Sequence, residues 1–275
     1  MRLKRAKLIW LGALLAVVAV FIWLAVGGYV EKAVRGNPTV FSVAKPAYET
    51  WGTVKILVVR AYRSRIADPG TIRHYLESHT VRKLQLGAGG NDAEGWLNSD
   101  LVPTSKEIYL DVTDRYPLPD ASFQYAFSEH VIEHVPWEGG LAMLKECHRV
   151  LAPGGKVRMV TPDLGRLNQL LAGTPDAEAQ RYIGAKLLFH AWPTTPVPGA
   201  YILNREAHSF GHQFLYDVAT LRKTFELAGF AQISEHRVGE KTDAVFQEAE
   251  SRTRFPGSEL WVMNNWEAMA VEAVR

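Results

Sequence analysis

The fold is decided by residues 82–90, RKLQLGAGG, in which a short apolar run leads into a glycine-rich turn. Leu84 and Leu86 alternate with polar residues, as is typical of a strand, and glycine accepts positive φ and lets a ligand approach the backbone closely. A dinucleotide-binding turn needs a third glycine where Asp92 stands, and a Walker-type loop needs a Gly-Lys-Ser/Thr sequence that does not follow. We therefore expect a strand that ends at a binding turn, with NAD disfavoured and a Walker-type phosphate site excluded.

Further strands and helices alternate downstream of this turn. Expected strands are residues 96–102, 107–112, 123–128, 156–162, 230–238 and 268–274. Expected helices are residues 131–151 and 215–230, the second closed by Gly229. Alternation of this kind predicts an α/β domain whose parallel-type sheet carries helices on both faces. Asp100 and Asp111 end the second and third strands, and ligands of such sheets bind outside the carboxyl ends of the strands.

Composition and charge limit the function classes. The chain has 275 residues, of which 47% are hydrophobic and 22% charged, as in a soluble domain with an appendage. Eleven of the 31 basic and two of the 29 acidic residues lie in residues 1–66, so this part carries +9 and the remainder −7. An acidic body is unsuited to the phosphate backbone, so we expect no nucleic-acid partner. Cys147 is the single cysteine, which excludes an intramolecular disulfide and a cysteine-based zinc site.

Residues 8–30, LIWLGALLAVVAVFIWLAVGGYV, contain no charged residue. As a helix they would cover roughly 34 Å, enough to cross a bilayer, and four basic residues precede them. This apolar run exceeds the usual core of a signal peptide, which is the alternative, so we predict a single N-terminal transmembrane helix. The predicted organisation is a membrane anchor over 1–30, a basic juxtamembrane connector over 31–80 and a folded domain over 81–275. Basic residues flank the span on both sides, so charge alone does not fix its orientation.

Five motifs in this order closely resemble the class I S-adenosylmethionine-dependent methyltransferases, and their type 11 branch in particular. They are LQLGAGG (84–90), NSD (98–100), LDVTD (110–114), PLPDASFQYAFSEHVIEHV (117–135) and ECHRVLAPGGKVRMVTPDL (146–164). The later segment 208–230, HSFGHQFLYDVATLRKTFELAGF, also resembles this branch. The resemblance spans roughly residues 81–275 and implies a Rossmann-like sheet and S-adenosylmethionine as the cofactor.

The resemblance also implies cofactor-binding positions. The glycine turn, Gly87, Ala88, Gly89 and Gly90, would border the methionine part of the cofactor. Asp100 would accept hydrogen bonds from the ribose, Asp111 and Val112 would flank the adenine, and Ser128 and Glu129 would lie beneath the sulfonium. Only twelve residues separate Gly87 from Asp100, so we expect the first helix of the family fold to be short or missing.

The sequence HVIEH, from His130 to His134, also matches the pattern of an inverted zinc metallopeptidase, in which two imidazoles four apart on one helical face hold the metal. Glu206, His208 or His212 could supply a third ligand. The type 11 branch carries a similar run that needs no metal, so we expect none.

The same histidines can be interpreted as bases. His134, His208 and His130, in that order, are candidates for removing a proton from a hydroxyl acceptor, because imidazole exchanges protons near neutral pH. Their structural alternative is to hydrogen-bond the backbone at a helix start or to anchor a loop.

Residues 172–205 lack clear periodicity, and we expect them to form an acceptor-binding insertion or lid. The expected activity is methyl transfer to a small-molecule, saccharide or lipid-linked acceptor at the membrane, with the catalytic domain in the cytosol, where the cofactor is made. The alternative from another class is a catalytically inactive scaffold or binding module tethered to the bilayer.

Overall fold

The computed structural model describes residues 56–172, 175–189, 196–240, 242–250 and 257–275. Residues 8–30, predicted as the membrane span, lie outside these ranges. No helix within them is both long and apolar enough to cross a membrane. The chain divides into two compact units, Met1–Tyr62 and Arg63–Arg275, and the fold described below is that of the second unit.

The second unit is built on a sheet whose order in the described part of the chain is β3-β2-β1-β4-β5-β7-β6. Its strands are β1 (Lys83–Leu86), β2 (Leu97–Asp100), β3 (Ile108–Tyr109), β4 (Phe123–Glu129), β5 (Leu151–Pro162), β6 (Ala231–Arg237) and β7 (Ala268–Val274). Neighbouring strands from β3 to β5 run parallel, whereas β7 pairs antiparallel with both β5 and β6. The predicted α/β class is confirmed, and the expectation of a parallel-type sheet needs correction at β7.

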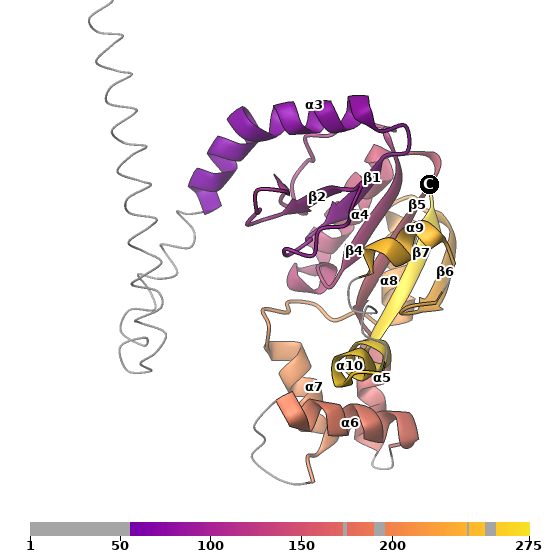
Figure 1. The fold of residues 1–275 in the computed structure, drawn as a ribbon. Coiled ribbons are helices and arrows are strands. Elements are labelled where there is room, and N and C mark those ends of the chain that lie inside the picture. Colours follow the sequence, from indigo (N-terminus) through magenta and orange to yellow (C-terminus); the bar gives the residue numbers. More distant parts are fainter. Residues whose placement is uncertain (1–55, 173–174, 190–195, 241, 251–256) are drawn as a thin grey trace, which may run out of the picture. The chain divides into compact units, whose positions relative to one another are not determined.

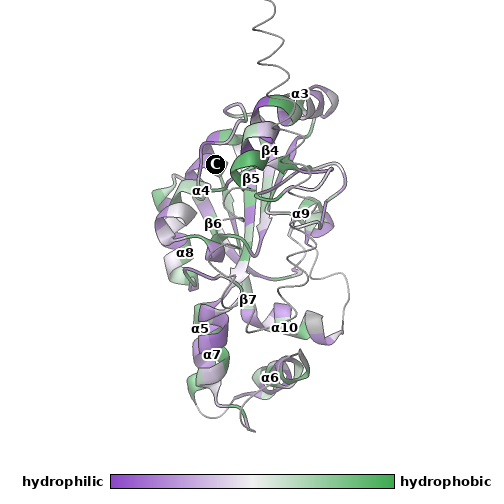
Figure 2. Ribbon diagram, turned by 90° about the vertical axis from the view of Figure 1, so that its left-hand side faces the viewer, coloured by the Kyte–Doolittle hydropathy of each residue, from purple (hydrophilic) through white to green (hydrophobic). Residues whose placement is uncertain are grey.

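Helices cover both faces of this sheet. One hydrophobic cluster joins the strands to α3 (Asp68–Ser78), α4 (Trp137–Val150) and α8 (Val218–Leu227). A second cluster, on the other face, includes Phe246 and Ala249 of α9 (Ala244–Ala249) together with Phe127 of β4. Figure 1 and Figure 2 show α3 beyond one end of the sheet and α5, α6, α7 and α10 gathered beyond the other.

The predicted helix over 131–151 begins later than expected. Residues Ile132–His134 form a short 3-10 helix, η2, and α4 starts at Trp137 after Pro136. Proline disfavours the helical conformation of the residue before it, and Val135 accordingly adopts an extended backbone with ψ 155°. Within α4, Met143, Leu144 and Cys147 share the buried face.

No helix lies between β1 and β2, as the short spacing predicts. The connection over 87–96 is held by side chains of the two strands instead. Gln85 donates to the Asn91 carbonyl and accepts from the Ala93 amide, both at 3.1 Å, and the amide side chain of Asn98 both accepts from and donates to the backbone of Ala93. Trp96 then packs against Phe127 in the second cluster, so this loop covers part of the face that a helix would otherwise cover.

A group of helices extends beyond the carboxyl ends of the parallel strands. It comprises α5 (Leu164–Gln169), α6 (Ala177–Phe189), α7 (Gly199–His208) and α10 (Glu259–Glu267). Tyr182 and Trp266 stack at 4.3 Å in its apolar centre. The buried Lys186 ammonium lies 2.8 Å from a Glu206 oxygen and 2.6 Å from a Glu267 oxygen. The segment predicted as an insertion thus folds largely as α6 and α7 on a core of its own.

Candidate active site

Three residues lie level with one another where β1, β2 and β4 end. In the sheet register Leu86 pairs with both Ser99 and Ser128, so the next residues along each strand are Gly87, Asp100 and Glu129. Asp111 follows β3, whose Tyr109 pairs with Asp100. The structure therefore brings the predicted glycine turn, the predicted acids and the end of β4 to one edge of the sheet.

Glycine is required in the turn after β1. Gly87 has φ +63°, and a Cβ at this position would lie 2.3 Å from Cγ2 of Val131. Gly89 and Gly90 also have positive φ, at +56° and +82°, but a Cβ at either would meet nothing within 4 Å. The turn is thus packed tightly against the loop after β4 at its start and is open at Gly89 and Gly90, where a ligand can approach the backbone.

Two carboxylates hold the open part of the turn. Asp100 Oδ2 accepts from the Gly89 amide at 3.0 Å, while its Oδ1 accepts from the Val102 amide at 2.8 Å. Glu107 Oε1 accepts from the Gly90 amide at 3.0 Å. Glu107 was not identified from the sequence, where its only distinguishing feature is a carboxylate at the start of an apolar run. In the structure this residue is only 2% exposed. The partly exposed Asp100 carboxylate keeps lone pairs for a ligand.

Asp111 has one carboxylate oxygen available. Its Oδ1 accepts from the amide and the hydroxyl of Thr113, at 3.0 and 2.7 Å. Among the described residues no hydrogen bond reaches Oδ2, and both Asp111 and Val112 are partly exposed. This carboxylate can accept a hydrogen bond from a ligand beside β3.

Buried polar atoms without partners lie at the end of β4. Ser128 is 1% exposed, and its hydroxyl makes no hydrogen bond within the described part of the chain. His130, at φ +53°, has a buried Nε2 that also lacks a hydrogen-bond partner there. Because buried polar groups are normally satisfied, these two atoms are available to hydrogen-bond a bound molecule.

A buried carboxylate orients His130. Its Nδ1 lies 3.0 Å from Oε1 of Glu133, and Oε2 of Glu133 accepts from the Thr161 hydroxyl at 3.0 Å. Burial alone would raise the pKa of Glu133, but the hydrogen bond and charge of His130 outweigh it and hold that pKa below its ordinary value. The Glu133 carboxylate therefore faces the Nδ1 side of the ring, and Nε2 is the nitrogen left available to a ligand. Thr161, at the end of β5, was not identified from the sequence.

The other candidate bases lie differently. The rings of His134 and His212 are 4.9 Å apart in edge-to-face contact. Burial lowers the pKa of His134, although the charge of Glu133 opposes this shift. His208 ends α7 and is exposed. Glu206 lies in the ion pair with Lys186, so it does not join His130 and His134.

The helical arrangement that the alternative, a zinc site at HVIEH, would need is not formed by these residues. Only residues 132–134 are helical, as a 3-10 turn, and Nδ1 of His130 faces Glu133. A different group, Glu133, His134 and His212, has potential ligand atoms within 4.8 Å of one another. Oε2 of Glu133 accepts from the Thr161 hydroxyl and Oε1 lies 3.0 Å from Nδ1 of His130, so a metal ion at this group would have to displace one of these contacts.

One family model matches part of the chain. The family model described as a methyltransferase domain matches residues 98–159, from β2 into β5. No curated protein sequence matches the chain.

Among solved structures, an S-adenosylmethionine-dependent methyltransferase from Mesorhizobium loti is 17% identical, covers 77% of this chain and 99% of its own, and has a TM-score of 0.41. One from Archaeoglobus fulgidus is 15% identical, with coverages of 80% and 93% and a TM-score of 0.41. Phosphoethanolamine N-methyltransferase 2 of Haemonchus contortus, in complex with S-adenosyl-L-methionine, is 15% identical, with coverages of 74% and 51% and a TM-score of 0.38. The chain therefore spans about half the length of this last protein.

Proposed function

Since this chain belongs to the type 11 branch of the class I S-adenosylmethionine-dependent methyltransferases, we propose that it transfers a methyl group to a small-molecule, saccharide or lipid-linked acceptor at a membrane. The observation that carries the proposal is the row formed by Gly87, Asp100 and the end of β4, with Asp111 beside it. Carboxylates at neighbouring strand ends beside an open glycine turn suit a nucleoside whose hydroxyl and amine groups donate hydrogen bonds.

The residues present fit the nucleoside part of the cofactor. Asp100 would accept from the ribose, Asp111 from the adenine amine, and the open backbone at Gly89 and Gly90 allows close approach. The unpartnered Ser128 hydroxyl would hydrogen-bond within the same site. The bound cofactor supplies an electrophilic methyl group on a sulfonium. Because 87–96 form no helix, the helix N-terminus that would support the carboxylate end of the cofactor is missing from this turn.

The base is His130 if the acceptor is a hydroxyl. Glu133 holds the Nδ1 side of the ring at 3.0 Å, and the Thr161 hydroxyl fixes Glu133 in turn. Nε2 would then accept the acceptor proton as the new bond to carbon forms. Holding donor and acceptor in line lowers the barrier further through proximity. His134, whose pKa burial lowers, lies four residues further along the chain and is the second candidate.

Attachment to the bilayer is part of the proposal. It rests on the uncharged residues 8–30 and the nine basic charges in excess over residues 1–66. A cofactor made in the cytosol requires the catalytic domain to face that side. Alkaline carbonate extraction of cell membranes should leave the full chain in the pellet, and trypsin added outside intact cells should leave the domain uncut. Release of the chain by carbonate would contradict an anchor.

Calorimetric titration of S-adenosylmethionine into the full chain in detergent tests the activity. We expect binding at micromolar strength and a weakening by about 1–3 kcal/mol in Asp100→Asn, which loses a charged acceptor. Glu77→Gln is the matched control, because it removes an exposed carboxylate of α3 next to the start of β1, away from the site.

The loop that replaces the first helix is the observation that favours an inactive scaffold. A folded chain that binds no S-adenosylmethionine would support the scaffold and refute the enzyme.

A further inference from the structure

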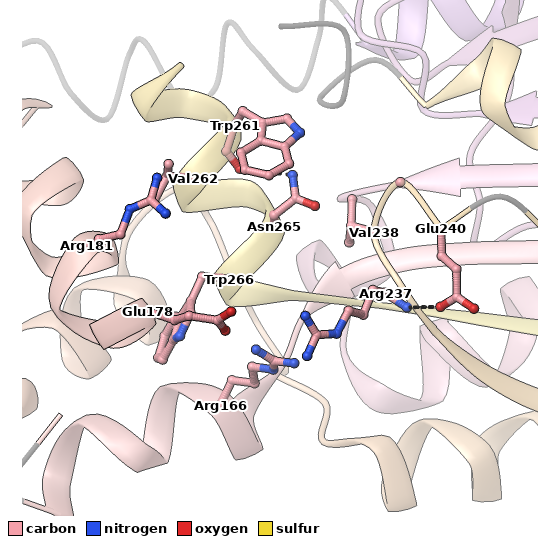
Figure 3. A pocket seen from close by; sticks show the side chains of 11 residues that line it. Arg166, Glu178, Arg181, Arg237, Val238, Glu240, Trp261, Val262, Asn265 and Trp266 are labelled. Atoms are coloured by element: carbon pink, nitrogen blue, oxygen red, sulfur yellow. Dashed lines mark hydrogen bonds between the residues drawn. The ribbon is translucent and has the colours of Figure 1, made fainter. Parts of the chain in front are cut away.

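A hollow opens on the same edge of the sheet as the candidate active site. It has a volume of about 460 Å³ and lies among α5, α6, α10 and the end of β6 (Figure 3). Its walls carry three arginines from three different elements: Arg166 of α5, Arg181 of α6 and Arg237 of β6. Trp261, Trp266 and other apolar side chains complete the lining.

The three guanidinium groups make few contacts within the fold: Arg181 and Arg237 are exposed, and the charge of the half-buried Arg166 opposes the rise that burial causes in the pKa of Asp163. Among the described residues none of them makes a hydrogen bond or an ion pair through its side chain. By contrast, Arg149 pairs with Glu146 and Asp120, and Arg158 with Glu250 and Glu272. Figure 3 shows the guanidinium groups of Arg166 and Arg237 pointing toward each other, with Arg181 reaching toward Val262. Like charges that face one hollow between aromatic walls are stabilised by an anion.

Two carboxylates also line the hollow, so its own lining carries one positive charge in excess, while Asp163 and Glu235 lie with Arg166 and Arg237 around a neighbouring hollow. Glu240 is already engaged, since it accepts from the Arg237 amide at 2.9 Å and lies 3.5 Å from His236. Glu178 is exposed on the first turn of α6 and has no ion pair among the described residues. Its carboxylate points toward the space between Arg166 and Arg237, where it would repel an anion (Figure 3).

The position of the hollow relates it to methyl transfer. The end of β6 is separated from the end of β4 by β5 and β7. At about 4.8 Å per strand spacing, the two ends lie roughly 14 Å apart along the edge. A molecule that reaches both must carry its anionic group roughly 14 Å from the methylated atom.

We propose that Arg166, Arg237 and Arg181 form a subsite for a phosphate or carboxylate group on a saccharide-like methyl acceptor. Planar guanidinium groups bind either anion in a bidentate manner, and Trp261 lines the same hollow. The identification of the bound molecule as the methyl acceptor rests on the proposed function. The anion site itself stands on the unpaired arginines alone.

Titration calorimetry of the full chain with four probes tests this subsite: inorganic phosphate, glucose 1-phosphate, glucuronate and glucose. We expect the three anions to bind and glucose not to bind, with glucose 1-phosphate tighter than phosphate if the aromatic wall contributes. Arg166→Gln and Arg237→Gln should each weaken anion binding roughly 10-fold or more, because each removes a charged hydrogen-bonding partner. Glu178→Gln should strengthen it. Arg73→Gln, an exposed arginine on α3, is the matched control.

The relative affinities of glucose 1-phosphate and glucuronate show whether the subsite prefers a phosphate or a carboxylate group. Anion binding that is absent, equal to that of glucose, or unchanged in Arg166→Gln would overturn the subsite. Titration of S-adenosylmethionine into the same variants separates this inference from the proposed function. Cofactor affinity should not change, and a parallel loss would show that the arginines belong to the cofactor site. Anion binding by a chain that binds no S-adenosylmethionine would refute the enzyme and keep the anion site.

Discussion

Replacing His130 by glutamine is expected to lower the rate of methyl transfer by roughly 10²–10⁴-fold while the affinity for S-adenosylmethionine stays within twofold. The reason is the arrangement of the ring: Glu133 contacts Nδ1 at 3.0 Å, and the buried Nε2 has no partner in the described part of the chain. Glutamine fills similar space but does not accept a proton. The rate is measured as S-adenosylhomocysteine released in the presence of a lipid and saccharide extract of the cells that make the protein.

Glu133→Gln tests the positioning role of the carboxylate. A neutral amide does not orient the ring as strongly through Nδ1, so kcat should fall with KM nearly unchanged. His74→Gln, an exposed histidine of α3, is the matched control and should keep the wild-type rate. A wild-type rate in His130→Gln together with a large loss in His134→Gln would assign the base to His134 instead.

Replacing Arg158 by methionine is expected to lower the free energy of unfolding by about 3–5 kcal/mol, because it leaves buried carboxylates without their partner. Arg158 is 1% exposed in the centre of β5 and contacts Glu250 at 2.5 Å and Glu272 at 2.6 Å. Burial raises the pKa of Glu250 even though Arg158 opposes this shift. Urea denaturation of the full chain, followed by tryptophan fluorescence, measures the change.

A double variant separates the lost pair from lost packing. Arg158→Met with Glu250→Leu removes the stranded charge as well, so it should recover part of the stability of the single variant. Arg73→Met should change stability by less than about 0.5 kcal/mol, as is usual for an exposed site. A loss below about 1 kcal/mol in Arg158→Met would mean that the carboxylates find other partners.

Local patterns were sufficient to predict most strands and the missing first helix. Alternating apolar residues mark β1 and β4, and twelve residues between Gly87 and Asp100 leave no room for a full crossover helix. The direction of β7 was not predictable. Its residues are mostly apolar on both faces, and such a pattern is the same for a parallel and an antiparallel strand. The start of α4 was predicted too early. HVIEH has helical spacing, but Pro136 keeps Val135 in an extended conformation, so the helix begins only at Trp137.

The candidate site was predictable where strand ends bring residues together. Asp100 and Asp111 follow neighbouring strands, so their shared edge could be inferred from the alternation alone. Thr161 and Glu133 could not be paired in advance, because they are 28 residues apart on β5 and the loop after β4. The arginine-lined hollow was missed for the same reason: its arginines come from three elements whose packing against α10 the sequence pattern does not specify.

The most direct test of the account is a crystal structure of the full chain with S-adenosylhomocysteine bound. We predict that the ribose lies against the Asp100 carboxylate, the adenine beside Asp111 and Val112, and the sulfur near Ser128. The Gly89 and Gly90 backbone should face the ligand. A ligand bound elsewhere, including the hollow lined by Arg166 and Arg237, would contradict the cofactor site described for β1, β2 and β4.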